Sequence, residues 1–359
     1  MAFTATGIGQ TGAARIAGDR RALSTLMTAV LSVALVLIML FSLGWGAASD
    51  TDVIGALVGA EGVSLRDTTI VWDIRLPRVL TGALVGAALA VSGAIMQGLF
   101  RNPLADPGLV GVSAGAGFGA VIAIVLGGSA PIWLQATLGV YMVPFAAFFG
   151  GWITTILLYS VATRNGRTSV ATMLLAGIAL AALTGALTGV LVYYATDDEL
   201  RDLTFWGLGS VAGANWEKLW SAAPLIALCL LVAPFMARSL NALALGEAAA
   251  GHMGIPVQRM KRFAILTVAG SVGAAVAITG GIGFVGIVVP HLLRLVQGPD
   301  HRGLLVNSAL LGSIMLLLAD AISRTIIAPA EMPIGIITAM IGGPFFLWIL
   351  MRNRALVDL

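Results

Sequence analysis

Long apolar stretches separated by short polar segments cover most of this chain. An apolar run of about 20 residues is long enough to cross a bilayer as a helix, and such runs recur ten times. The predicted spans are residues 22–44, 76–100, 107–127, 136–161, 170–195, 218–238, 263–281, 283–298, 304–328 and 333–351. The pattern therefore predicts an all-α polytopic membrane protein with about ten transmembrane helices per subunit. A cytosolic tail, residues 1–21, would precede a single transmembrane domain over residues 22–359.

A repeated segment divides the chain into two halves. Residues 85–95 read VGAALAVSGAI and residues 272–282 read VGAAVAITGGI, with seven identical positions in eleven. The copies lie on the second and seventh spans, which would cross the membrane in opposite directions. We therefore expect an inverted repeat that relates spans 2–5 to spans 7–10, an arrangement typical of transporters. Glycines four residues apart predict close helix contacts: Gly82 and Gly86; Gly111, Gly115 and Gly119; Gly185 and Gly189.

Composition and charge place the chain in lipid and orient it. Hydrophobic residues make up 58% and charged residues only 10% of the sequence, which excludes a water-soluble protein. With the N-terminus inside, fourteen of the twenty Lys and Arg residues fall in inner segments, as the positive-inside rule requires. Membrane topology thus accounts for the basic residues without a nucleic-acid partner. We expect a membrane protein with both termini cytoplasmic.

No group of residues predicts catalysis, a metal site or a cofactor. The three histidines lie apart, each explained most simply as a hydrogen-bonded structural residue, and Cys229 is the single cysteine. Neither of the two lysines follows a glycine, so the chain has no phosphate-binding loop that ends in Gly-Lys. If transport uses ATP, another polypeptide must bind it.

Three charged features remain, and each allows two interpretations. Arg75 and Arg78 begin the second span at its outer end, where they could bind carboxylates of a partner or extend to the membrane surface. Asp320 and Arg324, four residues apart, could form a structural ion pair or face the interior of the bundle. The inner loop 239–262 could form a helix on the membrane surface or a coupling helix that binds a cytosolic motor subunit.

Several segments together resemble one family. They are RLPRVLTGALVGAALAVSGAIMQGLFRNPLADPGLVGVSAGAG (75–117), LALGEAAAGHMGI (243–255), GFVGIVVPHLLRL (283–295), DHR (300–302) and EMPIGIITAMIGGPFF (331–346). In these segments the chain resembles the permease subunits of type II ABC importers for iron-siderophores, haem and vitamin B12. The resemblance extends over nearly the whole chain from about residue 22.

The resemblance implies partners and residue roles. It implies a location in the bacterial inner membrane. Expected partners are a second copy of this chain, two copies of a cytosolic ABC ATPase subunit and a periplasmic binding protein. Three arginines would receive acidic residues of the binding protein: Arg75, Arg78 and Arg324. The coupling residues would be Leu245, Gly246, Glu247, Ala248, Ala249, Gly251, Met253 and Gly254. The cytoplasmic gate would comprise Asn102, Leu104, Val170 and Ala171, although the last two positions are polar in the vitamin B12 importer.

The expected substrate is haem, without a resident cofactor. The segment YYATDDELRDLTFWGLGSVAGANW (193–216) is more similar to haem permeases than to the vitamin B12 importer. A ferric siderophore or cobalamin carried by the same mechanism is the alternative within the family. From another class, an ion-coupled secondary transporter would need a carboxylate within the membrane, and Asp320 is the one candidate.

Overall fold

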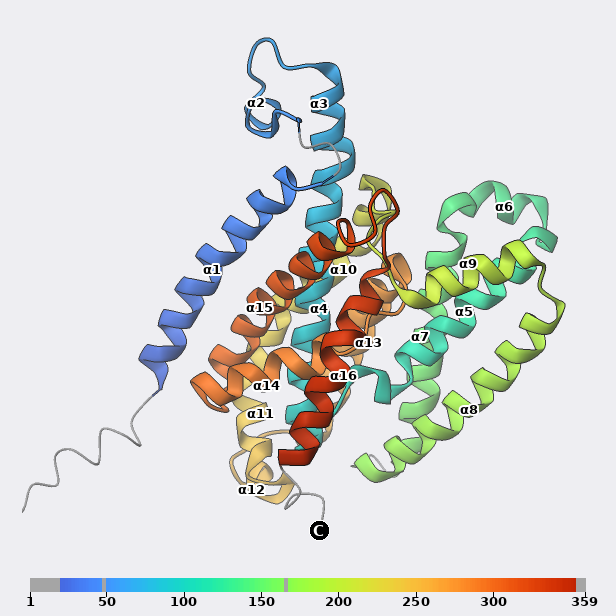
Figure 1. The fold of residues 1–359 in the computed structure, drawn as a ribbon. Helices are drawn as coiled ribbons and strands as arrows, with labels where there is room; N and C mark the ends of the chain where they lie inside the picture. Colours follow the sequence, from blue (N-terminus) through green and yellow to red (C-terminus); the bar gives the residue numbers. More distant parts are fainter. Residues whose placement is uncertain (1–19, 47–49, 165–166, 353–359) are drawn as a thin grey trace, which may run out of the picture.

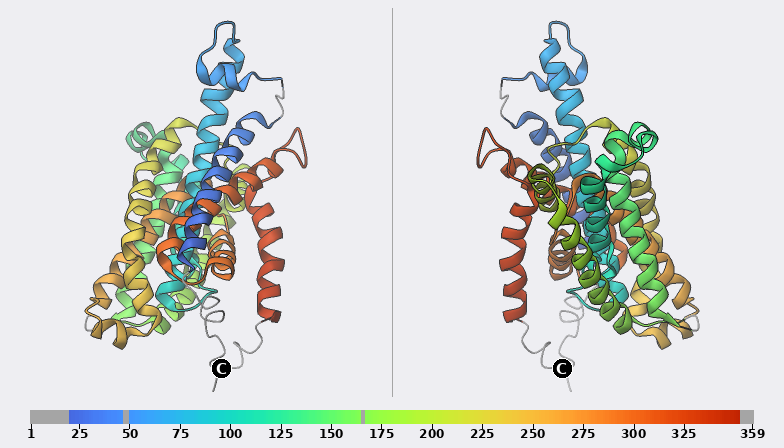
Figure 2. Two further views of the ribbon diagram at one scale, coloured as in Figure 1. Left: turned by 90° about the vertical axis from the view of Figure 1, so that its left-hand side faces the viewer. Right: turned by 90° about the vertical axis from the view of Figure 1, so that its right-hand side faces the viewer.

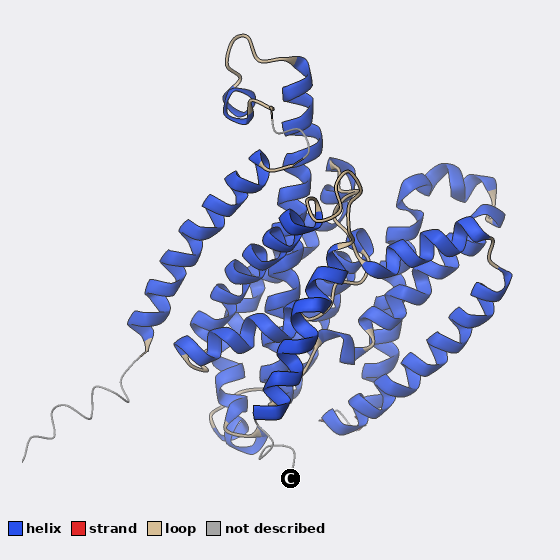
Figure 3. Cartoon of the chain, in the orientation of Figure 1, coloured by secondary structure: helices blue, strands red, loops and turns tan. Residues whose placement is uncertain are grey.

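The computed structural model describes residues 20–46, 50–164 and 167–352, and nearly all of them are helical (Figure 3). Ten longer helices make up the body of this described part: α1 (Arg21–Gly44), α4 (Leu76–Phe100), α5 (Val112–Leu126), α7 (Met142–Ala162), α8 (Val170–Tyr194), α10 (Trp216–Val232), α13 (Val257–Thr279), α14 (Val285–Gln297), α15 (His301–Ser323) and α16 (Ile334–Arg352). They coincide with the ten predicted spans within a few residues. The predicted tail lies almost entirely outside the described residues.

Eight segments in the described part of the chain are long and apolar enough to cross a membrane. The apolar helices α14 and α16 are shorter, and α14 has only 13 residues. The polytopic all-α fold is thereby confirmed. The described chain begins at α1 and ends at α16 on the same side of the body, the side of α12 (Figure 1). An even number of crossings requires this arrangement.

Short elements connect the long helices. On the side of the body opposite α12 lie α2 (Val53–Val58) and α3 (Leu65–Thr69), which a π-helical turn, η1 (Ile70–Arg75), joins to α4 (Figure 2). The other short helices are η2 (Pro107–Val110), η3 (Gly127–Ser129), α6 (Ile132–Leu138), η4 (Gly139–Tyr141), α9 (Asp197–Leu208), η5 (Ala233–Met236), α11 (Ala237–Ala244) and α12 (Glu247–His252). The strands β1 (Thr163–Arg164) and β2 (Arg167–Thr168) pair in an antiparallel hairpin ahead of α8.

The packing of the two halves is reciprocal, as an inverted repeat requires. Helix α4 packs along α15, and its counterpart α13 packs along α7, the counterpart of α15. Likewise α4 contacts α14, and α13 contacts α5. The two copies differ at one point: α13 ends at Thr279, whereas α4 continues to Phe100, beyond the equivalent Gly93. The predicted repeat of spans 2–5 and 7–10 is therefore present, with an early break in the second copy.

Close backbone contacts explain some of the regularly spaced glycines. A Cβ atom at Gly86 would lie 2.3 Å from the carbonyl oxygen of Gly312, and one at Gly119 would lie 2.0 Å from that of Ala146. Helix pairs this close gain packing contacts that lipid cannot replace. Gly185 and Gly189 differ, since no described atom lies within 4 Å of a Cβ at either position. The prediction of a close helix contact is wrong for this pair within the described part of the subunit.

The core lies around α4, α13 and α15, and the other helices surround it. In its most apolar window 83% of α4 is buried, compared with 11% for α1 and 11% for α8. The exposed faces of α1, α8 and α16 carry large apolar side chains, including Val33, Leu175 and Leu347. Such faces are stable against lipid or another subunit but not against water.

Candidate functional site

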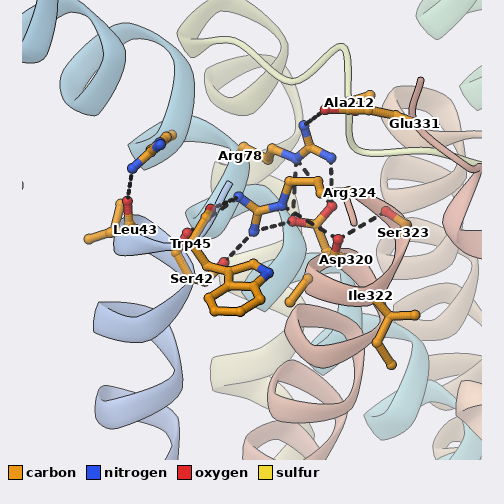
Figure 4. Close-up of polar contacts among 12 residues, drawn as sticks. Ser42, Leu43, Trp45, Arg78, Ala212, Asp320, Ile322, Ser323, Arg324 and Glu331 are labelled. Atoms are coloured by element: carbon orange, nitrogen blue, oxygen red, sulfur yellow. Dashed lines mark hydrogen bonds and ion pairs between the residues drawn. The ribbon is translucent and has the colours of Figure 1, made fainter. Parts of the chain in front are cut away.

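The three arginines expected to bind a partner lie at the end of the molecule opposite α12, where two of them enclose a buried carboxylate (Figure 4). Arg78 Nη2 donates to Asp320 Oδ1 at 2.9 Å, and Arg324 Nη2 lies 2.8 Å from Asp320 Oδ2. Arg78 Nη1 also lies 2.9 Å from Oε1 of Glu331, in the segment between α15 and α16. Asp320 itself is fully buried. Its charge is therefore compensated from two helices, as a buried carboxylate requires.

Arg75 and Arg324 also form hydrogen bonds that hold the end of α1 against the core. Arg75 Nη1 donates to the carbonyl oxygen of Leu43 at 2.6 Å. Arg324 donates to Ser42 Oγ at 2.6 Å and to the carbonyl oxygen of Trp45 at 2.9 Å. The last turn of a helix leaves carbonyl groups without intrahelical partners. The guanidinium groups supply partners at the end of α1 (Figure 4).

The burial of these side chains bears on two of the open interpretations. Arg75, Arg78 and Arg324 are only 5%, 7% and 8% exposed, and their hydrogen bonds are made within the subunit. They therefore do not extend to the membrane surface. Asp320 and Arg324 form an ion pair and also face the interior of the bundle, so both interpretations of this pair hold. The cluster of Arg75, Arg78, Arg324, Asp320 and Glu331 carries three positive and two negative formal charges.

The sequence analysis did not identify Glu331, although it is the member of the cluster most open to solvent. Its side chain is 38% exposed, compared with 1% for Asp320. Its position in the sequence could have indicated it, because Glu331 directly precedes the tenth predicted span, on the same side of the membrane as the arginines.

The opposite end of the molecule carries the expected coupling residues. Segment 239–262 is not a single loop: it includes most of α11, all of α12 and the first six residues of α13. Gly246 and Gly254 flank α12 with φ angles of +105° and +80°, which favour glycine. Leu245 and Met253 are 70% and 56% exposed, whereas Ala250 is buried against the core. The helix thus presents apolar side chains outward at its two ends.

Side chains anchor α11 and α12 to the core. Asn241 Nδ2 donates to Asp300 Oδ1 at 2.7 Å, and Asn241 Oδ1 accepts from the His301 backbone N–H at 3.0 Å. Burial alone would raise the pKa of the Asp300 carboxyl, but hydrogen bonds from Arg302 N–H and Asn241, aided by the charge of Arg302, hold that pKa below its usual value. On the other side, Lys261 pairs with Glu247 at 2.7 Å.

The expected gate residues lie in two segments. Asn102 Oδ1 accepts a hydrogen bond from Leu104 N–H at 2.9 Å in the loop after α4, where Asn102 is exposed. Val170 and Ala171 form the first turn of α8, which Ser169 caps by accepting from Thr172 N–H at 3.3 Å. Helix α8 also contacts η2, the short helix that follows the first of these segments. In the described residues no three metal-ligating side chains come together.

Comparison with known proteins gives a consistent result. The sequence pattern described as the FecCD transport family matches residues 31–352. The chain is 47% identical to the hemin transport system permease protein HmuU of Yersinia pestis, over 79% of this chain and 84% of that protein. It is 44% identical to the vitamin B12 import system permease protein BtuC of Citrobacter koseri, over 81% and 85% of the respective chains.

Solved structures agree with the fold. An inward-facing structure of a metal-chelate type ABC transporter is similar with a TM-score of 0.80 and 32% identity, over 91% of this chain and 99% of that one. PsaBC of Streptococcus pneumoniae is similar with a TM-score of 0.52 and 16% identity, over 76% and 89% of the respective chains. The second similarity concerns the fold alone.

Proposed function

Because the chain belongs to the FecCD transport family over residues 31–352, we propose that it is the permease subunit of an ATP-driven importer and that its substrate is haem. The family level is firm: the chain is a permease subunit of a type II ABC importer for haem, vitamin B12 or siderophores. It has no nucleotide-binding site of its own. The haem assignment rests on the 47% identity to a hemin permease over 84% of that protein.

The two ends of the molecule would bind different partners. The arginine cluster lies at the end of α4 that the distribution of basic residues places outside, where a periplasmic binding protein would dock. The exposed Leu245 and Met253 at the α12 end would fit a groove of a cytosolic ATPase subunit. Two copies of the permease would bring two ATPase subunits together, and both termini would then be cytoplasmic.

Transport would proceed by alternating access. A loaded binding protein docks at the outer end, ATP binding closes the two ATPase subunits, and α12 transmits that closure to the two gate segments. The asymmetric break at Gly280 supports motion at the end of α13, because a helix end allows backbone rotation that a continuous helix does not. Gate opening would then release substrate to the cytoplasm.

Cobalamin and ferric siderophores are the alternative substrates within the family. The 44% identity to a vitamin B12 permease is close to the value for the hemin permease, so identity alone separates them weakly. The segment 193–216 favours haem, and Tyr193 and Tyr194 stand exposed within it, 83% and 75% accessible. Flat aromatic rings stack well on a porphyrin.

An ion-coupled secondary transporter is disfavoured by the state of Asp320. A coupling carboxylate must gain and lose an ion during each cycle. Asp320 is instead held by Arg78 and Arg324, and it lies close to the outer end of its helix. Both carboxylate oxygens are already bonded to guanidinium groups, so a coupling ion would have to displace one of these partners in every cycle.

Uptake into proteoliposomes tests the proposal. The vesicles would contain this chain with its ATPase subunit and receive binding protein loaded with haem, cobalamin or a ferric siderophore. ATP-dependent uptake of haem alone is the expected result. Uptake of another ligand would keep the importer and overturn the haem assignment. No uptake of any ligand, without stimulation of ATP hydrolysis, would overturn the importer itself.

A further inference from the structure

One buried lysine joins the coupling helix to the start of α8. Lys261, in the second turn of α13, is only 2% exposed. Its Nζ donates to Glu247 Oε1 at 2.7 Å and to the carbonyl oxygen of Thr168 at 2.8 Å. A buried ammonium group is unfavourable unless hydrogen bonds replace its lost water. The neighbours of Lys261 therefore hold it in one position.

The three bonded residues belong to three different elements. Glu247 begins α12, Lys261 belongs to α13, and Thr168 ends the β1–β2 hairpin. Gln258 strengthens the last contact, since its Oε1 accepts from Thr168 N–H at 2.9 Å. Gln258 and Lys261 are three residues apart on α13, so one helix face holds both backbone groups of Thr168. Thr168 is consequently fixed to α13.

The hairpin leads directly into the gate segment. Thr168 is followed by Ser169, which caps α8, and then by Val170 and Ala171. A displacement of Thr168 must therefore change the position of the first turn of α8. Charge-assisted hydrogen bonds are short and directional, so they transmit displacement better than apolar contacts of similar area.

We propose that Lys261 is a positioning residue that transmits movement of α12 to the gate segment of α8 through Glu247 and Thr168. This inference rests on the proposed function, because it assumes that an ATPase subunit moves α12. The Glu247 side chain is 43% exposed, whereas that of Lys261 is 3% exposed. A motor subunit that covers α12 would remove water from this ion pair and strengthen it. The contact would then be tightest in the closed, ATP-bound state.

The test measures the solvent accessibility of the α8 gate segment and does not depend on the identity of the substrate. Ala171 is exposed, and Cys229 is the single cysteine, so Cys229→Ser with Ala171→Cys gives one reactive thiol at the gate. The rate of labelling by a water-soluble maleimide would be measured in the complex with the ATPase subunit, with ADP and with trapped ATP. We expect the two rates to differ. Adding Lys261→Met should reduce the ratio of the rates about fivefold or more, the usual range of coupling between sites.

Two further variants separate transmission from a role in folding. Lys261→Arg keeps a cation that can reach both acceptors and should retain the nucleotide response. Lys218→Met, at the other lysine of the chain, should respond as the background does. If Lys261→Met does not fold, Glu247→Gln serves instead, because it leaves the bond between Lys261 and Thr168 intact. It should reduce the ratio of the rates as well.

A double-mutant cycle completes the test. Glu247→Gln combined with Lys261→Met should reduce the nucleotide response no more than Lys261→Met alone. Additive losses, or an unchanged response in Lys261→Met, would overturn the transmission role while leaving the importer intact. If the background protein itself shows no nucleotide response and no stimulated ATP hydrolysis, the proposed function fails as well. The two failures are thus distinguishable.

Discussion

At the residue scale, the arginine cluster has a structural role that any test of its proposed docking role must take into account. Asp320 needs a cation because it is fully buried, and Arg78 and Arg324 both supply one. Removing one partner of a buried ion pair costs about 3–5 kcal/mol. Charge reversal at Arg78 would therefore disrupt the fold before it could report on docking. Glu331, at the solvent-facing side of Arg78, is the better position for a test.

The variant Glu331→Gln should bind the binding protein more tightly. It removes the carboxylate that competes for Arg78 and leaves the bonds between Arg78 and Asp320 in place. Because an exposed ion pair contributes at most about 1 kcal/mol, we expect the Kd to fall about two- to fivefold. The measurement is surface plasmon resonance with loaded binding protein, with Glu217→Gln as the control. An unchanged or higher Kd would contradict docking at Arg78.

A second prediction concerns acid stability at Asp300. Its folded-state pKa lies below the ordinary value, so the carboxylate stabilises the protein above the unfolded pKa, and this stabilisation is lost as the pH falls through the folded pKa. The variant Asp300→Asn should therefore melt at a lower temperature than wild type between about pH 5 and 7. The difference should shrink below about pH 4.

Thermal unfolding in detergent across that pH range would measure the effect. The control is Glu61→Gln, at an exposed loop position where no similar loss is expected. A melting-temperature difference for Asp300→Asn that does not change with pH would show that the hydrogen bonds of this carboxylate, and not its charge, anchor α11 to α15.

At the element scale, the repeat predicts which helices are equivalent but not how tightly each one packs. Gly86 and Gly273 occupy the same place in the two copies. A Cβ atom at Gly86 would lie 2.3 Å from a backbone oxygen of α15, whereas one at Gly273 would lie 3.5 Å from the Phe148 ring of α7. A Cβ at Gly86 would meet backbone, which cannot move aside. A Cβ at Gly273 would meet a side chain, which can. The two equivalent glycines should therefore differ in their tolerance of substitution by alanine.

The variant Gly86→Ala should destabilise the protein by about 1–3 kcal/mol through overpacking against α15. Its matched control, Gly273→Ala, should leave stability unchanged or raise it by up to about 1 kcal/mol, since alanine favours helix over glycine. The midpoint of denaturant unfolding in micelles measures both. Equal losses at the two positions would show that helix geometry is symmetric and that the close contact at Gly86 is unimportant.

The lengths of the apolar runs predicted the long helices because a bilayer requires about 20 apolar residues for each crossing. The partners of Asp320 were only partly predictable. Arg324 is four residues away on the same helix, a spacing that sequence reveals, but Arg78 lies 242 positions away. Tertiary packing brings such residues together, and a single sequence carries no record of it. The bond from Lys261 to Thr168 was missed for the same reason, because a carbonyl acceptor has no side-chain signature.

At the scale of the whole molecule, the exposed faces indicate where the subunit is incomplete. Helices α1 and α8 are buried to the same small extent, yet they differ in composition. Both helices expose large apolar side chains, which lipid accommodates, but α8 also exposes Gly185 and Gly189 within its length, whereas the one glycine of α1 is its last residue. Small residues on an exposed helix face allow another backbone or a large substrate to approach. We therefore expect the open face of α8 to meet the second subunit or the transport pathway.

The variants Gly185→Trp and Gly189→Trp should fold normally and abolish uptake. Both glycines are exposed, and apart from the adjacent helix backbone no described atom lies within 4 Å of a Cβ at either position, so a larger side chain can point away from the subunit. In the assembled importer it would fill the space that the second subunit or the substrate needs. Size-exclusion chromatography and ATP-dependent uptake would be measured together, with Val33→Trp on the exposed face of α1 as the control. Full uptake by both glycine variants would mean that this face of α8 contacts only lipid, and the pathway would then have to lie along another helix.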